Sequence, residues 1–250
     1  MNTGEARLPN VKTLIFFTWR YTMNYQKNLK YFKSTDTLYY IGLAVMILGA
    51  GLFVLAYIFW TYLFWYQDIV GLALTAVGAL VAFIPRSLRS SEKDIDEAIA
   101  EMTKDYETNT AEELGIQNQL IRELKPLLVG AYIYEDGALF RRGRTDRKFR
   151  SDRYTAAALL FTKNGVCVAE KSFSLIEDGV KETVSEFLYS DIDGLFVESE
   201  IHSFASGEQT TVARLTVKAG QKTLLSVPVT QSAALDRACE EINTRIRRGK

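Results

Sequence analysis

The chain has 250 residues, of which 48% are hydrophobic and 24% are charged, and its 30 basic and 30 acidic side chains give a formal net charge of zero. This balance excludes an electrostatic case for nucleic-acid binding by the whole protein, so charged segments have to be judged one at a time. The charges are unevenly spread, because residues 38–85 contain a single charged side chain, Asp68. The sequence therefore predicts a membrane-embedded part joined to a soluble part.

Residues 1–37 combine aromatic side chains with basic ones. Aromatic rings favour the headgroup layer of a bilayer, where cations also meet anionic lipid. We therefore expect an interfacial helix here, with an ordinary helix packed on the soluble domain as the alternative. The membrane-interface residues expected from this pattern are Trp19, Arg20, Lys27, Lys30 and Lys33.

Residues 38–85 predict a hairpin of two membrane-spanning helices. Residues 38–67 are uncharged, which exceeds the roughly 20 residues that a helix needs to cross a hydrocarbon core, and a second apolar run covers residues 69–84. Tyrosines and tryptophans lie near the ends of these runs, as aromatic belts do. Glycines and alanines in both runs allow close helix packing, either within one hairpin or between copies of the chain.

The orientation follows from lysines and arginines, which precede the first span and follow the second but do not occur in the connection between them. By the positive-inside rule, both termini are predicted to be cytoplasmic, and the protein is predicted to lie in an inner or plasma membrane with two spans. Cys167 and Cys239 would then be unpaired thiols in a reducing compartment, and we expect both to be buried. Their spacing, together with the single histidine, His202, expected at a surface or loop position, predicts no metal site and no cofactor.

Residues 86–126 predict an acidic helical linker. Ser90 and Ser91 suit a helix start, and a second helical stretch is expected at residues 111–124, before Pro126. Between residues 92 and 123, ten acidic side chains outnumber three basic ones, which gives this stretch a net charge of −7. We expect a solvated stalk that an anionic membrane repels.

From residue 127 onward the hydrophobic period becomes that of strands with turns between them. A first hairpin is expected across residues 131–140, and Lys163-Asn164-Gly165 predicts a second one, because Asn-Gly supplies the positive φ angles of a type I′ turn. The pattern predicts an antiparallel α+β domain over residues 127–250, large enough to have its own core. The later strands and the closing helix are expected at residues 183–188, 195–201, 211–218, 222–229 and 232–247.

Two segments and the order of the elements carry a family resemblance. Residues 157–168 read as an apolar strand, a Thr with a polar turn and a second apolar strand, and residues 187–195 begin a strand with an aromatic-Ser-Asp-Ile pattern. Together with the closing strand pair and the C-terminal helix, they resemble the pleckstrin-homology-like superfamily, in particular the bacterial PH-like and GRAM-like domains attached to short transmembrane hairpins. The resemblance covers about residues 127–248 and implies an antiparallel PH-like β-barrel or sandwich capped by a helix. The chain departs from the family's compact form by an insertion at residues 175–182 and by residues 141–153, and this architecture hosts lipid-binding, peptide-binding and scaffolding roles.

The strongest local charge lies in residues 141–153, where seven basic side chains are opposed only by Asp146 and Asp152, for a net charge of +5. We expect a loop at one end of the sheet, following the first hairpin. By the resemblance, it is similar to the basic early loop with which some PH domains hold phosphoinositide headgroups, where arginines suit phosphate oxygens. An internal partner for the acidic linker and a plain solvated loop are the alternatives. The candidate residues for binding a lipid or a partner are Arg141, Arg142, Arg144, Arg147, Lys148, Arg150 and Arg153.

The sequence has no pattern typical of a catalytic site, such as a Gly-rich phosphate loop, a metal-ligand cluster or a nucleophile elbow. We therefore expect a non-enzymatic, membrane-anchored recognition or scaffolding protein, whose cytosolic domain binds anionic lipid headgroups or a protein partner and no nucleic acid. The alternative is a homo-oligomeric membrane-complex or channel subunit with a regulatory soluble domain. A channel usually has polar groups at membrane depth, whereas Asp68 lies near the expected turn.

Overall fold

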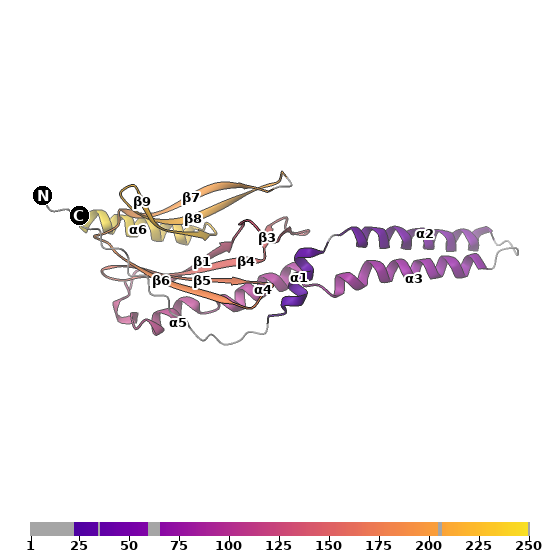
Figure 1. Ribbon diagram of the computed structural model, residues 1–250, viewed down its shortest axis with the longest axis horizontal. Helices are drawn as coiled ribbons and strands as arrows, with labels where there is room; N and C mark the ends of the chain where they lie inside the picture. The colour runs from indigo at the N-terminus through magenta and orange to yellow at the C-terminus, as the bar shows by residue number, and fades with distance from the viewer. Residues whose placement is uncertain (1–22, 35, 60–65, 205–206, 250) are drawn as a thin grey trace. The chain divides into compact units, whose positions relative to one another are not determined.

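The computed structural model describes residues 23–249 apart from residues 35, 60–65 and 205–206 (Figure 1). The described chain forms two compact units, of which one is Asn24–Ile95 and the other contains Asp96–Lys250. The helix α4, Glu92–Thr103, contains the division between them. Each unit is described by itself.

The first unit consists of three helices and the start of α4. Helix α1 is short, and α2 and α3 are long and apolar enough to cross a membrane, which confirms the prediction of two such helices. Their bounds are Tyr25–Lys33 for α1, Thr37–Phe59 for α2 and Tyr66–Ser87 for α3.

Glycines bring α2 and α3 into backbone contact. A Cβ atom added to Gly78 would lie 2.4 Å from the backbone nitrogen of Met46, and one added to Gly42 would lie 2.5 Å from that of Ala82. Gly49 has an equally close approach to α3, whereas nothing lies within 4 Å of a Cβ on Gly51. The small residues thus pack helix against helix within the hairpin, which was one of the two predicted uses.

The second unit contains two antiparallel sheets, a short separate hairpin and the helix α6 (Figure 1). The four-stranded sheet has the order β1-β4-β5-β6, with bounds Leu127–Tyr132, Arg153–Phe161, Gly165–Ser174 and Val180–Leu188. The three-stranded sheet has the order β7-β8-β9, with bounds Gly194–Ser203, Gln209–Ala219 and Lys222–Val229. The separate hairpin pairs β2, Phe140–Arg142, with β3, Phe149–Ser151, and α6 covers Ala233–Gly249. These elements confirm the α+β prediction of antiparallel sheets followed by a C-terminal helix.

The main core lies between the sheets and α6, because Leu235 and Ile242 of α6 are fully buried against Leu159 and Leu215 of the two sheets. Side chains alternate along a strand, so Ala158 and Leu160 of β4 face the opposite way. They form a second apolar cluster with helix α5, Tyr106–Glu113. Strand β4 is therefore buried on both faces, which explains its continuous apolar run.

Helix α5 corrects the expectation of a solvated stalk. Tyr106 and Ala111 of α5 are 8% and 3% exposed and pack on the four-stranded sheet. The expected helix at residues 111–124 is also wrong, because α5 ends at Glu113. Gly115 has a φ of +65°, and the Ile116 N–H donates to the Ala111 carbonyl, so the helix closes as glycine-terminated helices commonly do. Only a short 3₁₀ turn, η1, follows at Gln117–Gln119.

The expected first hairpin is also wrong, since β1 pairs with β4 rather than with β2. The turn itself is present, because the Ala138 N–H donates to the Glu135 carbonyl. The residues that follow it, Phe140–Arg142, include two arginines and are half-exposed or exposed, so they cannot bury β1, whereas β4 is apolar on both faces. The insertion expected at residues 175–182 is a five-residue connection between β5 and β6.

The second predicted hairpin forms, but its turn is not type I′. Neither Asn164 nor Gly165 has a positive φ angle. Instead, the Thr162 hydroxyl oxygen accepts a hydrogen bond from the Gly165 N–H and donates one to the Gly165 carbonyl. Glycine is required at position 165 for a different reason, since a Cβ there would lie 2.1 Å from the Phe187 carbonyl oxygen of β6.

Candidate functional site

The arginine-rich segment forms the β2–β3 hairpin, which is inserted between β1 and β4 and is here called the arginine hairpin (residues 140–151). The sequence predicted a loop, and the structure gives paired strands with Arg141 opposite Arg150. The Gly143 N–H donates to the Lys148 carbonyl at 2.7 Å, and Arg147 has a left-handed φ of +59° in the turn. The basic side chains are therefore held on a defined scaffold.

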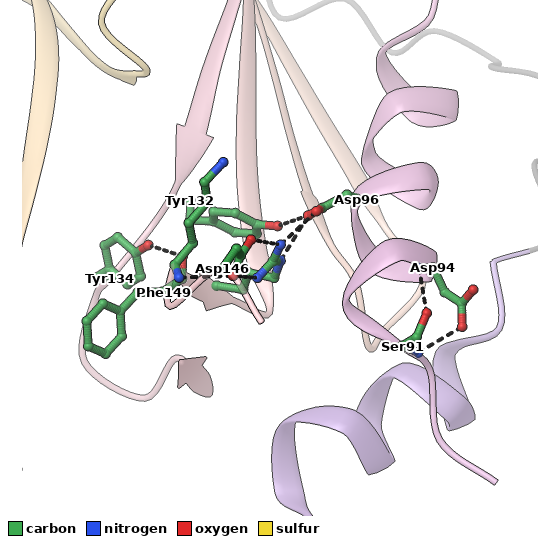
Figure 2. A network of polar contacts seen from close by, with 9 residues as sticks. Ser91, Asp94, Asp96, Tyr132, Tyr134, Asp146 and Phe149 are labelled. Carbon is green, nitrogen blue, oxygen red and sulfur yellow. Dashed lines mark hydrogen bonds and ion pairs between the residues drawn. The ribbon is translucent and has the colours of Figure 1, made fainter. Parts of the chain in front are cut away.

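Arg150 is the centre of a charged network. Its partners Asp96 and Asp146, and Tyr132 beside them, are labelled in Figure 2. The Arg150 side chain is only 3% exposed, and Nε and Nη2 donate to the two carboxylate oxygens of Asp96 on α4 at 2.9 and 2.7 Å. Its Nη1 and Nη2 donate to Asp146 of the hairpin turn at 3.1 and 2.7 Å. The Tyr132 hydroxyl of β1 adds a hydrogen bond to Asp96 at 3.2 Å. Two carboxylates thus occupy the two edges of one buried guanidinium.

The network perturbs the groups around Arg150. Hydrogen bonds from the Arg150 guanidinium, followed by the Lys148 backbone N–H, lower the pKa of the Asp146 carboxyl to about 2. Burial, with a further contribution from the Asp96 carboxylate, raises the pKa of Tyr132 well above its usual range. Arg150 and Asp146 therefore remain charged at neutral pH, and Tyr132 remains a hydrogen-bond donor.

The other predicted basic residues differ in how far they are engaged. Arg142 forms an ion pair with Glu208 at 2.8 Å and lies over the Phe149 ring, and Arg153 lies 3.9 Å from Glu135. Arg141 and Arg144 are half-buried. Arg147 and Lys148 have exposed side chains in the hairpin turn. The structure therefore brings the predicted binding residues together, but it makes Arg150 a structural centre and leaves the turn cations facing solvent.

An aromatic cluster around Phe204 holds the arginine hairpin against the end of β7. The rings of Phe140 and Phe149 lie 4.3 and 4.6 Å from that of Phe204, and Tyr134 of the segment after β1 contacts it at 5.5 Å. His202 stacks on Tyr134 and meets Phe204 edge to face. The expected loop position is therefore wrong, because His202 belongs to strand β7, where its half-exposed imidazole packs among aromatic rings.

A groove of about 520 Å³ adjoins the Arg150 network. Asp96 and Ile99 of α4 form part of its wall, together with Tyr132, Tyr154 and Lys148. The groove combines aromatic faces with charged groups, a combination that suits polar ligands with an anionic part.

The membrane-interface prediction falls on α1 only in part. Lys27, Lys30 and Lys33 are exposed at three-residue spacing along α1. Trp19 and Arg20 lie outside the described residues. The helix is fixed to the segment after α3, because the Ser90 hydroxyl donates to the buried Asn28 side chain at 2.6 Å.

A second fixed point joins the two ends of the hairpin. Arg89 donates to Ser34 at 2.7 Å and to Asp36 at 3.1 Å, so the segment after α3 is tied to the segment before α2. Beside it, the Arg86 guanidinium lies 5.4 Å from the centre of the Tyr39 ring. Basic and aromatic side chains thus gather where both helices end, as expected at a membrane–water boundary.

The environments of the two cysteines disfavour reaction at their thiols. Both cysteines are buried, and burial raises the pKa of Cys167 to about 12 and that of Cys239 to about 11. Thiols of this kind are poor nucleophiles. In the part of the chain that the structure describes, no group of three or more His, Cys, Asp or Glu side chains could hold a metal ion.

Sequence reasoning missed the carboxylate partners of Arg150. Asp96 precedes Arg150 by 54 residues, so no local spacing links them, and the pairing depends on the packing of α4. The general alternative that the arginine segment is a partner for the acidic linker did anticipate this contact. Asp146 lies four residues before Arg150 and carried a detectable signal, as one of the two acidic residues inside the run of basic ones.

No protein-family model, curated protein or solved structure matches this chain.

Proposed function

We propose that this chain is a membrane-anchored recognition protein whose sheet-rich domain, with PH-like architecture, binds anionic phospholipid headgroups through the arginine hairpin. The observation that carries the proposal is the pair of exposed cations, Arg147 and Lys148, on a hairpin turn that Arg150 and Asp146 hold in place. Preorganised cations bind anions better than a mobile loop does, because less conformational entropy is lost.

The order of elements supports the PH-like part of the proposal. The resemblance implies meandering antiparallel strands closed by a C-terminal helix, and the two sheets followed by α6 have that order. The arginine hairpin interrupts the first strand connection of the four-stranded sheet, which is where the resemblance places a basic ligand-binding loop. Function itself does not follow from a fold, so the charge of the hairpin is the stronger argument.

The chain length between the second span and the hairpin supports a membrane ligand. Asp96 follows Ser87, the last residue of α3, by nine residues, and nine residues extend to about 30 Å at most. Because Asp96 binds Arg150, this short tether favours a ligand at the membrane surface over one that is free in solution. This function requires that the protein lies in an inner or plasma membrane with both termini on the cytoplasmic side.

The alternative of an oligomeric channel or complex subunit has weaker support. Four glycines of α2 and α3, Gly42, Gly49, Gly71 and Gly78, approach backbone atoms closely, and they do so within one hairpin. These glycines therefore already contact the neighbouring helix of the same chain and are not available to pack against a second copy. We also propose that the chain is not an enzyme, since the buried thiols and the fully paired Arg150 network provide no activated nucleophile.

Vesicle flotation of the fragment 91–250 tests the proposal, once its cooperative unfolding has been checked. The test variant carries Arg147→Ser and Lys148→Ser, and the matched control carries Lys163→Ser and Lys222→Ser, two exposed lysines elsewhere in the same unit. A basic residue near anionic lipid contributes about 1 kcal/mol, so the hairpin variant should bind roughly thirtyfold more weakly.

Vesicles of phosphatidylcholine alone are compared with mixed vesicles that contain phosphatidylserine. We expect salt-sensitive binding to the mixed vesicles only, lost in the hairpin variant and kept in the control. Equal loss in both variants would mean that net charge, not the hairpin, attracts the fragment. No binding by the unaltered fragment would refute the lipid ligand and favour a protein partner.

A further inference from the structure

Helix α4 connects the second span to the sheet-rich unit, and one exposed carboxylate attaches its later part to the Arg150 network. Asp96 is 53% exposed, whereas the Arg150 side chain beneath it is 3% exposed. Asp96 therefore covers Arg150 on the solvent side. The remaining contacts of this part of α4 include the buried side chains of Ala98 and Ile99.

The geometry of the ion pair defines what Asp96 occupies. Its two oxygens take the edge formed by Nε and Nη2, while Asp146 takes the edge formed by Nη1 and Nη2. The Nε/Nη2 edge is a parallel pair of donors that fits a carboxylate or a phosphate equally well. A phosphate group could therefore replace Asp96 without any change in the Asp146 contact.

We propose that α4 is a detachable strap, and that Asp96 is an internal anion that occupies Arg150 until an anionic phosphate group displaces it. This inference rests on the proposed function, because the displacing group is the phosphate of a lipid headgroup with net negative charge or a free phosphate. Binding at the arginine hairpin then releases the helix that continues from the membrane span. Phosphate can reach this edge of Arg150 only when the strap is open. The apparent affinity for phosphate is therefore the intrinsic affinity multiplied by the fraction of molecules in which the strap is open.

Release of the strap has two physical consequences. Asp96 and Ile99 form part of the wall of the 520 Å³ groove, so their departure opens the groove beside Tyr132 and Tyr154. The helix also loses its support, and α4 has only 12 residues, a length that is marginally stable in water without tertiary contacts. Amide hydrogen exchange in residues 96–103 therefore reports whether the strap is open.

The test uses the full chain in lipid nanodiscs and measures hydrogen exchange in residues 96–103 and in the arginine hairpin. The variant is Asp96→Ala, and the matched control is Glu101→Ala, which removes an exposed carboxylate from the same helix without touching Arg150. The discs contain phosphatidylcholine, phosphatidylcholine with phosphatidylglycerol, or phosphatidylcholine with inorganic phosphate added to the buffer. The last two distinguish a headgroup from a free phosphate.

In neutral discs, Asp96→Ala should accelerate exchange in residues 96–103 by about tenfold or more, because charge-assisted hydrogen bonds are lost, and Glu101→Ala should not. In anionic discs, the unaltered chain should show slower exchange in the hairpin together with faster exchange in residues 96–103. Unchanged exchange in Asp96→Ala would overturn the strap, whatever the lipid does.

The two proposals fail in different ways. Hairpin protection by anionic lipid with no change in residues 96–103 would overturn the coupling and leave lipid recognition standing. No hairpin protection in either the unaltered chain or Asp96→Ala would refute lipid recognition and the competition together. Slower exchange in the arginine hairpin with anionic lipid, seen in Asp96→Ala but not in the unaltered chain, would support a strap that is closed in the unaltered chain.

Discussion

A buried ion pair beneath α5 offers the most direct test of how the sheet-rich unit is held together. Lys171 of β5 and Glu182 of β6 are directly opposite in the sheet, 3.5 Å apart, and their side chains are 5% and 6% exposed. The Tyr106 ring of α5 lies 5.2 Å from the Lys171 ammonium. The pair is thus enclosed between the sheet and the helix that the sequence placed in solvent.

Replacing Lys171 alone should be costly. Lys171→Met leaves the Glu182 carboxylate without its cation in a buried site, which typically costs about 3–5 kcal/mol. For a unit of this size, each kcal/mol lowers Tm by about 2–4 °C, so the expected decrease is roughly 6–20 °C. The double variant Lys171→Met with Glu182→Leu should regain most of this stability, because well-packed apolar residues replace a buried pair at little cost.

The pH dependence gives an independent check. Burial raises the pKa of Glu182 above its usual 4.5, and the charge of Lys171 opposes that rise. Between 4.5 and the raised value, the folded state holds more protons than the unfolded state, so stability falls as pH rises through this window. Lys171→Met removes the charge that opposes the rise, so the pKa of Glu182 increases further. The loss of stability caused by Lys171→Met should therefore be smaller near pH 5 than near pH 8.

Urea denaturation of the fragment 91–250, followed by circular dichroism at both pH values, measures these differences. Lys222→Met, at an exposed position of β9, is the matched control and should change stability little. The reasoning is refuted if Lys171→Met costs no more than this control. It is also refuted if the double variant is as unstable as the single one.

Three further predictions concern other parts of the molecule. Arg150→Met should flatten the pH dependence of stability between about pH 4 and pH 2. The pKa of Asp146 is lowered to about 2 in the folded state, so its carboxylate stabilises the fold above pH 3.8, and this contribution is lost as pH falls through 2. Acid titration of unfolding measures the difference. The fragment 127–250 should aggregate in sedimentation, whereas 91–250 should remain monomeric, because only the longer fragment keeps α5 over the sheet. Gly78→Leu should lower the thermal stability of the full chain in detergent, since its Cβ would meet Met46 at 2.4 Å.

Each of these has a control in the same chain. Arg237→Met, at an exposed position of α6, should leave the acid titration unchanged, and an equal effect would remove the argument for Asp146. Gly51→Leu adds the same volume where nothing lies within 4 Å, so equal destabilisation by both glycine variants would contradict close packing in the hairpin. A well-behaved fragment 127–250 would show that α5 is dispensable.

Local patterns were sufficient to predict several elements. The long uncharged runs led to α2 and α3, and the strand period led to β4 through β9, because each of these signals repeats within a few residues. The apolar stripe at the end of the chain led to α6 in the same way. The helix start expected at Ser90 and Ser91 is also a local signal, and α4 begins directly after them at Glu92. There Ser91 and Asp94 exchange hydrogen bonds between side chain and backbone N–H (Figure 2).

Other features depend on partners that are distant in the sequence. The choice of β4 over β2 as the partner of β1 depends on which segment can be buried on both faces. The packing of α5 depends on the four-stranded sheet, whose strand β4 begins more than 40 residues after the first residue of α5. Turn chemistry was misread at Asn164-Gly165 because the glycine is needed for its approach to β6, which no local pattern reveals.

Sequence patterns were enough to predict the two apolar helices, the antiparallel α+β domain and the concentration of positive charge in one segment, because periodicity and composition are properties of neighbouring residues. They could not predict that Arg150 is buried between Asp96 and Asp146 while Arg147 and Lys148 face solvent. Burial and ion pairing depend on which elements pack together, and residues 54 positions apart share no local signal.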